Sequence, residues 1–179
     1  SSSSAASDVY KRQAERLPNV LVSSSFSKSM SLYGERVGAL SVVCADADEA
    51  VRLRSQLKIV IRTNFSNPPT HGAQLAAIVL NDAALYDQWV DELGAMRERI
   101  KSMRGLLLDG LQAAGVQGFG HIVEQVGMFS YSGLSREQMQ RLRAEFGVYG
   151  TDKGRICLAA LNQRNVDYVA HAIAQVAQA

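Results

Sequence analysis

A lysine preceded by hydroxyl groups is the feature of this sequence best suited to covalent chemistry. Lys28 follows two serines, Ser25 and Ser27, at the end of an apolar run. Arg36 stands eight residues later. Burial at a strand end would lower the pKa of the lysine amine, as a Schiff-base lysine requires, and the hydroxyls and guanidinium could bind a phosphate. Two alternatives stay open: Lys28 as a solvated lysine in a serine-rich loop, and Arg36 in a surface ion pair with Glu35.

The elements that must position these groups are predicted from hydrophobic periodicity and from cap residues. Short apolar runs predict strands over 19–27, 38–44, 127–134 and 155–161, and the first of them reads as a buried strand that leaves its sheet at the serines. Helical spacing predicts helices over 46–58, 70–80, 82–114, 135–147 and 165–179. The helix over 82–114 is expected to be interrupted or bent near Gly94. Ser135 with Gln138, Gly147 and Asn165 are the expected cap residues.

Composition places the chain among ordinary globular proteins. Of its 179 residues 47% are hydrophobic and 20% charged, and the net charge of +2 gives no reason to expect nucleic acid or an anionic membrane as a partner. No apolar run approaches the roughly 20 residues that span a bilayer. Cys44 and Cys157 stand in apolar stretches, which favours buried thiols in a reducing cytoplasm. The scattered histidines show no metal-ligand spacing, so no metal is expected.

The first thirteen residues, SSSSAASDVYKRQ, look foreign to the rest of the chain. The string Asp8 to Gln13 resembles the translation of a transposon end used as a sequencing adaptor. Residues 1–13 are therefore interpreted as a non-native scar and left out of the fold prediction, with a genuine disordered tail as the alternative. Native sequence is expected to begin near Ala14, in the middle of a longer protein.

The string SSFSKSMSLYGERVGAL, which contains Lys28, resembles the cofactor-lysine segment of class I pyridoxal-phosphate-dependent aminotransferases, in the aspartate and aromatic amino acid branch. In that family the lysine bonds to pyridoxal 5'-phosphate and later moves the proton at the substrate Cα. A neighbouring serine and an arginine eight residues on bind the cofactor phosphate. The resemblance therefore implies cofactor-binding roles for Lys28, Ser25 and Arg36, with Ser27 as a weaker second candidate.

Two more strings resemble the substrate-binding segments of the same family. IRTNFSNPPTHG resembles the segment that reaches the partner subunit's active site, which implies that Arg62 binds the distal carboxylate of dicarboxylic substrates and Ser66 the partner's cofactor phosphate. GMFSYSG followed by GRICLAALN resembles two small-domain strands. There Arg155 would pair with the substrate α-carboxylate and Phe129 would form an apolar wall. The residues alone permit structural roles: Arg62 at a helix end, Arg155 capping a strand, and Phe129 in the core.

The resemblance covers residues 14–179 and implies an α/β enzyme of fold type I. Residues 14–85 would end the large cofactor domain, and residues 86–179 would form a long linking helix and the small α+β domain. Family residues that precede the lysine, such as the partner of the pyridinium nitrogen, have no counterpart here. The chain is therefore expected to be an incomplete, weakly active or inactive piece of a cytoplasmic homodimer.

The implied reaction is amino-group transfer between an L-amino acid and a 2-oxo acid, with 2-oxoglutarate and glutamate as one substrate pair. The second amino acid is aspartate or an aromatic one, with the context favouring the aromatic branch and an aspartate-specific enzyme as the alternative. A lyase or decarboxylase on the same fold is a rival, against which Arg62 argues. A non-catalytic domain that binds a phosphate ligand is the rival from another class.

Overall fold

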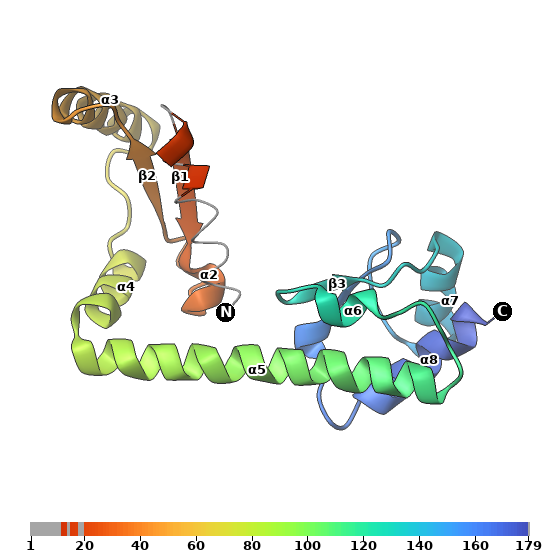
Figure 1. The fold of residues 1–179 in the computed structure, drawn as a ribbon. Helices are drawn as coiled ribbons and strands as arrows, with labels where there is room; N and C mark the ends of the chain where they lie inside the picture. The colour runs from red at the N-terminus through yellow and green to blue at the C-terminus, as the bar shows by residue number, and fades with distance from the viewer. Residues whose placement is uncertain (1–11, 14, 18–19, 179) are drawn as a thin grey trace. The chain divides into compact units, whose positions relative to one another are not determined.

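The structure, a computed structural model, describes residues 12–13, 15–17 and 20–178 (Figure 1). Residues 12–13 and 15–16 are helical, and the elements that follow are β1 (Val20–Ser25), α2 (Phe26–Ser29), β2 (Gly38–Val43), α3 (Ala47–Phe65), α4 (His71–Asn81), α5 (Ala83–Ala113), α6 (His121–Glu124), β3 (Phe129–Tyr131), α7 (Arg136–Phe146), β4 (Arg155–Cys157), the 3-10 helix η1 (Leu158–Ala160) and α8 (Val166–Ala177). No helix within the described residues has the length and apolar character needed to cross a bilayer. The scar interpretation of residues 1–13 falls almost wholly outside this description.

The chain divides into two compact units, one ending at Leu93 and the other beginning at Gly94. Helix α5 is continuous through this boundary, so the interruption that the sequence suggests near Gly94 does not occur. A helix-interior glycine costs conformational entropy, but it keeps its N–H and so leaves the hydrogen-bond ladder intact. The predicted division into residues 14–85 and 86–179 stays a prediction.

The amino-terminal unit is built on a two-stranded antiparallel sheet. Strands β1 and β2 pair in register from Val20 with Val43 to Ser25 with Gly38. Strand β1 ends because the Ser25 hydroxyl accepts a hydrogen bond from the Ser27 backbone N–H and so begins α2. The prediction of a buried strand is wrong. The sheet has only two strands, so β1 lies at its edge, and only Val20 of β1 is buried.

Helices α3 and α4 follow the sheet, and α3 continues to Phe65 rather than ending near residue 58. It begins at Asp46, whose carboxylate accepts from the Glu49 backbone N–H at 2.7 Å. It ends where the predicted stop SNPP begins, since proline cannot continue a helix. Among the described residues of this unit the buried apolar side chains are Val20 and Ala76.

The carboxy-terminal unit has a hydrophobic core to which α5, α7 and α8 contribute. Its largest fully buried apolar side chains are Leu107, Leu111, Ile122, Met139, Leu142, Leu158, Ile173 and Val176. The predicted caps of α7 are confirmed: Ser135 and Gln138 form a capping box, and Gly147 ends the helix in the left-handed conformation. Asn165 occupies the predicted N-cap position of α8, but its side chain makes no cap bond to the helix. Its carboxamide oxygen accepts from the Asn162 backbone N–H instead.

The two strands of this unit are shorter than the apolar runs that predict them. Strands β3 and β4 contain three residues each, paired antiparallel from Phe129 with Cys157 to Tyr131 with Arg155. The chain leaves β4 early because the next two N–H groups both donate to the Met128 carbonyl and a 3-10 turn follows. Cys44 and Cys157 are only half-buried, so the prediction of buried thiols is wrong.

Candidate active site

Lys28 lies in the one-turn helix α2, directly after β1. Its Nζ is 4.8 Å from the centroid of the Tyr33 ring, a cation–π distance. The side chain is exposed, so the predicted burial is wrong: a two-stranded sheet leaves the end of β1 uncovered. Of the two flanking serines, Ser25 is exposed and accepts from the Ser27 N–H at 3.2 Å. Ser27 is 4% exposed, which fits its place as the weaker candidate for a ligand contact.

Tyr33 contacts both Arg36 and Lys28. The Arg36 Nη1 donates to the Tyr33 carbonyl oxygen at 2.9 Å, so one tyrosine contacts Lys28 through its ring and Arg36 through its backbone. No ion pair between Arg36 and Glu35 occurs in the described structure. The alternative of a surface ion pair is therefore wrong. The sequence alone assigns no role to Tyr33, although this residue stands in the string YGER that also contains Arg36.

The backbone of Arg36 has φ of 52°, in the left-handed region that a non-glycine residue seldom adopts. The cost is of order 1 kcal/mol, and it is maintained only where surrounding contacts fix the conformation. The bond to Tyr33 is one such contact. Gly38 supplies close approach nearby, since a Cβ there would collide with the Ser24 carbonyl. Gly34 has open space around it and makes no such close approach.

Trp89 anchors α2 from helix α5, within the same unit. Its Nε1 donates to the carbonyl oxygen of Ser29 at 2.7 Å, and Ser29 is the residue after Lys28. Tyr86 packs beside the indole with ring centroids 5.6 Å apart. A lone tryptophan on the apolar side of a helix gives no sequence signal for this role.

Arg62 and Ser66 meet at the carboxyl end of α3. The Arg62 Nη1 donates to the Ser66 hydroxyl at 2.9 Å, and both side chains are exposed. Ser66 has φ of 64° and ψ of −72°. The Asn67 N–H donates to the Phe65 carbonyl at 2.8 Å across it, which makes a γ-turn. The two predicted residues, Arg62 and Ser66, are therefore joined by a hydrogen bond at a strained turn that ends the helix.

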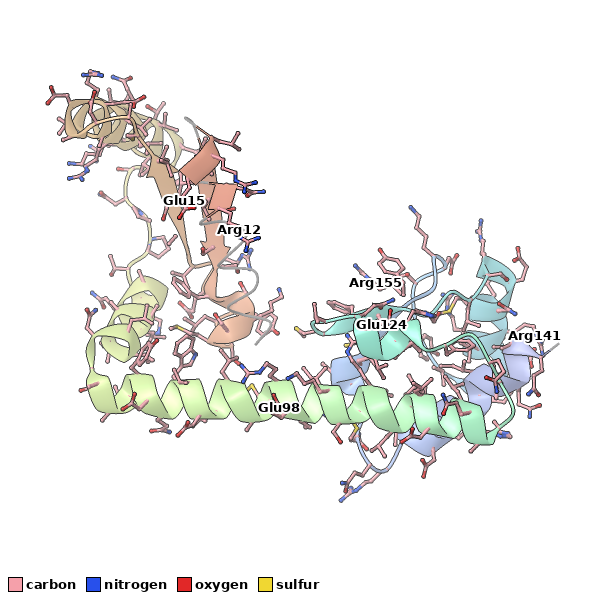
Figure 2. The ribbon with its side chains drawn as sticks, viewed as in Figure 1. Arg12, Glu15, Glu98, Glu124, Arg141 and Arg155 are labelled. Carbon is pink, nitrogen blue, oxygen red and sulfur yellow. The ribbon has the colours of Figure 1, made fainter. Side chains whose placement is uncertain are left out.

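Arg155 and Phe129 meet across the β3–β4 pair, in the carboxy-terminal unit. The Arg155 guanidinium carbon is 4.9 Å from the centroid of the Phe129 ring, and Figure 2 labels Arg155 beside α6 and β3. Phe129 is 44% exposed, so the alternative of a core phenylalanine is wrong. Gly154, directly before Arg155, has φ of 85°, and a Cβ there would lie 2.9 Å from the Leu134 carbonyl oxygen.

The geometry thus forms three local pairs from the predicted residues: Lys28 with Arg36 through Tyr33, Arg62 with Ser66, and Arg155 with Phe129. Each pair presents a cation at an exposed position, and each cation matches an anionic or carbonyl ligand. Comparison with known proteins decides the family. The model of the class I and II aminotransferases matches residues 2–173. The chain belongs to this family.

Curated members of the aminotransferase family align with most of this chain. The aspartate aminotransferase of Pseudomonas aeruginosa is 55% identical over 87% of the chain, and the mitochondrial aspartate aminotransferase of Xenopus tropicalis is 49% identical over 88% of it. These alignments take in 39% and 37% of the two relatives. The chain thus spans about two fifths of the length of the curated relatives it matches.

Solved structures of aminotransferases share the fold. The aromatic-amino-acid aminotransferase of Burkholderia pseudomallei, covalently bound to pyridoxal phosphate, superposes with a TM-score of 0.91 at 59% identity, over 96% of this chain and 43% of that one. The aromatic aminotransferase of Psychrobacter sp. B6, cocrystallised with aspartic acid, gives 0.93 at 49% identity, over 99% of this chain and 44% of that one. The predicted family and the predicted α/β fold class are confirmed.

Proposed function

We propose that this chain is part of a pyridoxal-phosphate-dependent aminotransferase that moves an amino group between an L-amino acid and a 2-oxo acid. The observation that carries the proposal is the Tyr33-linked pair of Lys28 and Arg36. A primary amine can bond covalently to an aldehyde, and a guanidinium can bind a phosphate. The two groups together therefore suit a ligand that carries both. The family match and the cofactor bound in the Burkholderia pseudomallei relative support the same cofactor.

The residues present fit this cofactor chemically. The Ser25 hydroxyl accepts one hydrogen bond and keeps its own hydrogen for an acceptor such as a phosphate oxygen. The Arg36 guanidinium donates to the Tyr33 carbonyl through Nη1 and has further N–H groups that can face the phosphate. Ser27 stays the weaker phosphate ligand. Ser66 is proposed to reach the cofactor phosphate of a partner subunit, as the family resemblance implies.

Each side chain then has one task in the reaction. Bound pyridoxal phosphate supplies an aldehyde and an electron-withdrawing ring. When the cofactor is bound, the Lys28 amine would hold its aldehyde, and the same amine would move the proton at the substrate Cα. Arg155 binds the substrate α-carboxylate through two parallel N–H donors, with Phe129 as an apolar wall beside the substrate. Arg62 binds the distal carboxylate of a dicarboxylic substrate.

Two arginines for two carboxylates imply glutamate and 2-oxoglutarate as one substrate pair. For the other pair we propose an aromatic amino acid or aspartate, with an aspartate-specific enzyme as the alternative. The relatives support both kinds, since aspartate aminotransferases and aromatic-amino-acid aminotransferases match the chain. A homodimer is proposed from the role given to Ser66. A cytoplasmic location is proposed as well, and a rice relative is described as cytoplasmic.

The first test traps the cofactor on the chain itself. We expect incubation with pyridoxal phosphate, borohydride reduction and peptide mapping to label Lys28 above the other exposed lysines, such as Lys58 and Lys101. The Lys28→Ala variant should lose this label, and a Lys58→Ala variant should keep it. Uniform labelling of all lysines would contradict the cofactor role. Phosphate-sensitive binding without a reduced adduct would favour the non-catalytic phosphate-binding domain.

The second test supplies the rest of the fold. Residues 20–178 are placed in the Burkholderia pseudomallei aminotransferase in exchange for the matching segment, and transamination with 2-oxoglutarate is measured for tyrosine and aspartate. We expect activity that Lys28→Ala reduces by several orders of magnitude, with the unaltered host as positive control. A folded, cofactor-loaded but inactive chimera would contradict the proposed function.

A further inference from the structure

Arg104 is a buried cation at the centre of the carboxy-terminal unit, and the proposed reaction gives it no task. It lies on α5 between the core residues Met103 and Leu107, and 3% of its surface is exposed. No ion pair in the described residues includes it. A buried guanidinium without a carboxylate partner is unfavourable unless its N–H groups are satisfied. The hydrogen-bond acceptors of the Arg104 guanidinium therefore indicate its role.

Its guanidinium donates almost entirely to backbone carbonyls of one short segment. Nη1 donates to Ile122 O at 2.7 Å and, more weakly, to the Ser130 hydroxyl at 3.4 Å. Nη2 donates to Gly127 O and Phe129 O, both at 2.8 Å. The planar fork thus joins the middle of α6, the turn before β3 and the first residue of β3.

This segment contains Phe129, one of the two residues of the Arg155–Phe129 pair. Phe129 begins β3, and its ring lies under the Arg155 guanidinium at 4.9 Å. The strands that carry the two residues are three residues long, so few ladder bonds fix them. The turn before β3 includes Gly127 with φ of 87°. Because glycine has no side chain to restrict its backbone, this turn is not held rigid by its own sequence. The bond from Arg104 Nη2 is therefore a direct restraint on the Phe129 carbonyl in addition to the ladder, and it acts beside the bonds that Leu158 and Ala159 donate to the Met128 carbonyl.

We propose that Arg104 is a positioning residue that fixes the Phe129 backbone and through it the placement of the Arg155 guanidinium. The inference rests on the proposed function for what the pair binds, namely the substrate α-carboxylate. A lysine cannot replace the arginine fully, because one ammonium cannot span carbonyls of residues 122, 127 and 129 in the way a planar fork does. Weakening the restraint should therefore displace Arg155 before it unfolds the unit.

The direct test is a side-chain NMR signal in the full chain. The Nε–H resonance of Arg155 should carry a ring-current shift from Phe129, and a Phe129→Leu variant gives its position without the ring. We expect Arg104→Lys and Arg104→Gln to move the resonance toward that position. Val176→Ala is the control, because it removes core volume from α8 and should leave the resonance in place. An Arg155 resonance unchanged in both Arg104 variants would overturn the proposal, as would complete unfolding of Arg104→Lys.

The kinetic test uses the chimera described above. Arg104→Lys should raise KM for every amino acid and oxo acid substrate by roughly tenfold, with a smaller loss of kcat, because all substrates share the α-carboxylate. Val176→Ala should lower the unfolding midpoint without this KM change. Equal KM values in chimera and variant would overturn the proposal. An inactive parent chimera would count against the proposed function alone, since the NMR shift requires no turnover.

Discussion

Three non-glycine residues of the described chain have left-handed backbone conformations: Ser31, Arg36 and Ser66. Two of them are residues to which the family resemblance assigns phosphate contacts. Strained conformations cost of order 1 kcal/mol or more and persist where the surrounding structure fixes them. At Arg36 the fixing contact is the bond to Tyr33, and at Ser66 it is the bond from Arg62. The strain thus lies at the proposed ligand-binding positions.

Replacing Arg62 by leucine should separate the two substrate classes. The variant removes the guanidinium proposed to bind the distal carboxylate and keeps an apolar side chain. We expect kcat/KM for aspartate and 2-oxoglutarate in the chimera to fall about 100-fold or more, and kcat/KM for tyrosine to fall far less. Arg54→Leu, which changes an exposed arginine of the same helix, is the control and should change neither value. Equal losses for both substrate classes would refute the role of Arg62.

Replacing Arg155 by lysine should impair all substrates alike. The ammonium keeps the charge but loses the two parallel donors that match a carboxylate. We expect kcat/KM to fall about 100-fold for aspartate and tyrosine together, measured by steady-state kinetics of the chimera. Arg164→Lys, an exposed arginine in the loop before α8, should change neither. A loss confined to dicarboxylates would exchange the roles proposed for Arg155 and Arg62.

The sequence proposes site residues through the family resemblance, but it does not predict their environments. The motif strings indicate Lys28, Arg36 and Arg155 by residue type and order. The exposure of Lys28 and the tyrosine that joins it to Arg36 depend on packing that no local pattern encodes. Arg104 gives no signal either, because an arginine within an amphipathic helix reads as solvated until its acceptors, 18 to 25 residues away, are known.

At the level of elements, helix α7 has the most complete local encoding. Ser135 accepts from the Gln138 N–H at 3.2 Å, and Gln138 returns a bond to the Ser135 N–H at 2.8 Å. Gly147 then stops the helix at φ of 63°. Start, periodicity and stop all agree here, which is why sequence reasoning sets both ends of this helix correctly.

Removing the capping hydroxyl should therefore destabilise the chain measurably. Ser135→Ala leaves the first-turn N–H groups without their side-chain partner, and we expect a loss of about 1 kcal/mol in the free energy of unfolding. Urea denaturation followed by circular dichroism measures it. Ser135→Asp, which keeps a side-chain acceptor, should lie close to the original. Indistinguishable midpoints for the alanine and aspartate variants would show that the box contributes nothing.

The strands were predicted less well than the helices, for a reason visible at β4. The run RICLAAL reads as a seven-residue strand, yet only Arg155–Cys157 pairs and Leu158–Ala160 forms a 3-10 turn. A short apolar run is equally compatible with a strand and with a buried turn. The carbonyl of Met128 decides the outcome by accepting two N–H groups, and this is a tertiary contact.

At the scale of the whole chain, the two units differ in how much core they contain. The hydrophobic cluster lies entirely between Met103 and Val176, so it belongs to the unit that begins at Gly94. The other unit exposes apolar side chains along its helices and sheet, including Leu21 at 70%, Val51 at 66% and Val60 at 61%. Burial of apolar area is the dominant favourable term in folding. The stability of the chain should therefore reside mostly in residues 94–179.

This difference predicts that residues 94–179 fold without the rest of the chain. Expressed alone, they should give a dispersed amide NMR spectrum and one cooperative urea transition, because the cluster and the α7 capping box are both retained. Leu111→Ala, a fully buried position, should lower the free energy of unfolding of this segment by about 2 to 5 kcal/mol. Residues 12–93 alone should show no cooperative transition, since their described part buries little more than Val20 and Ala76. A cooperative transition in residues 12–93, or a collapsed spectrum from residues 94–179, would contradict this prediction.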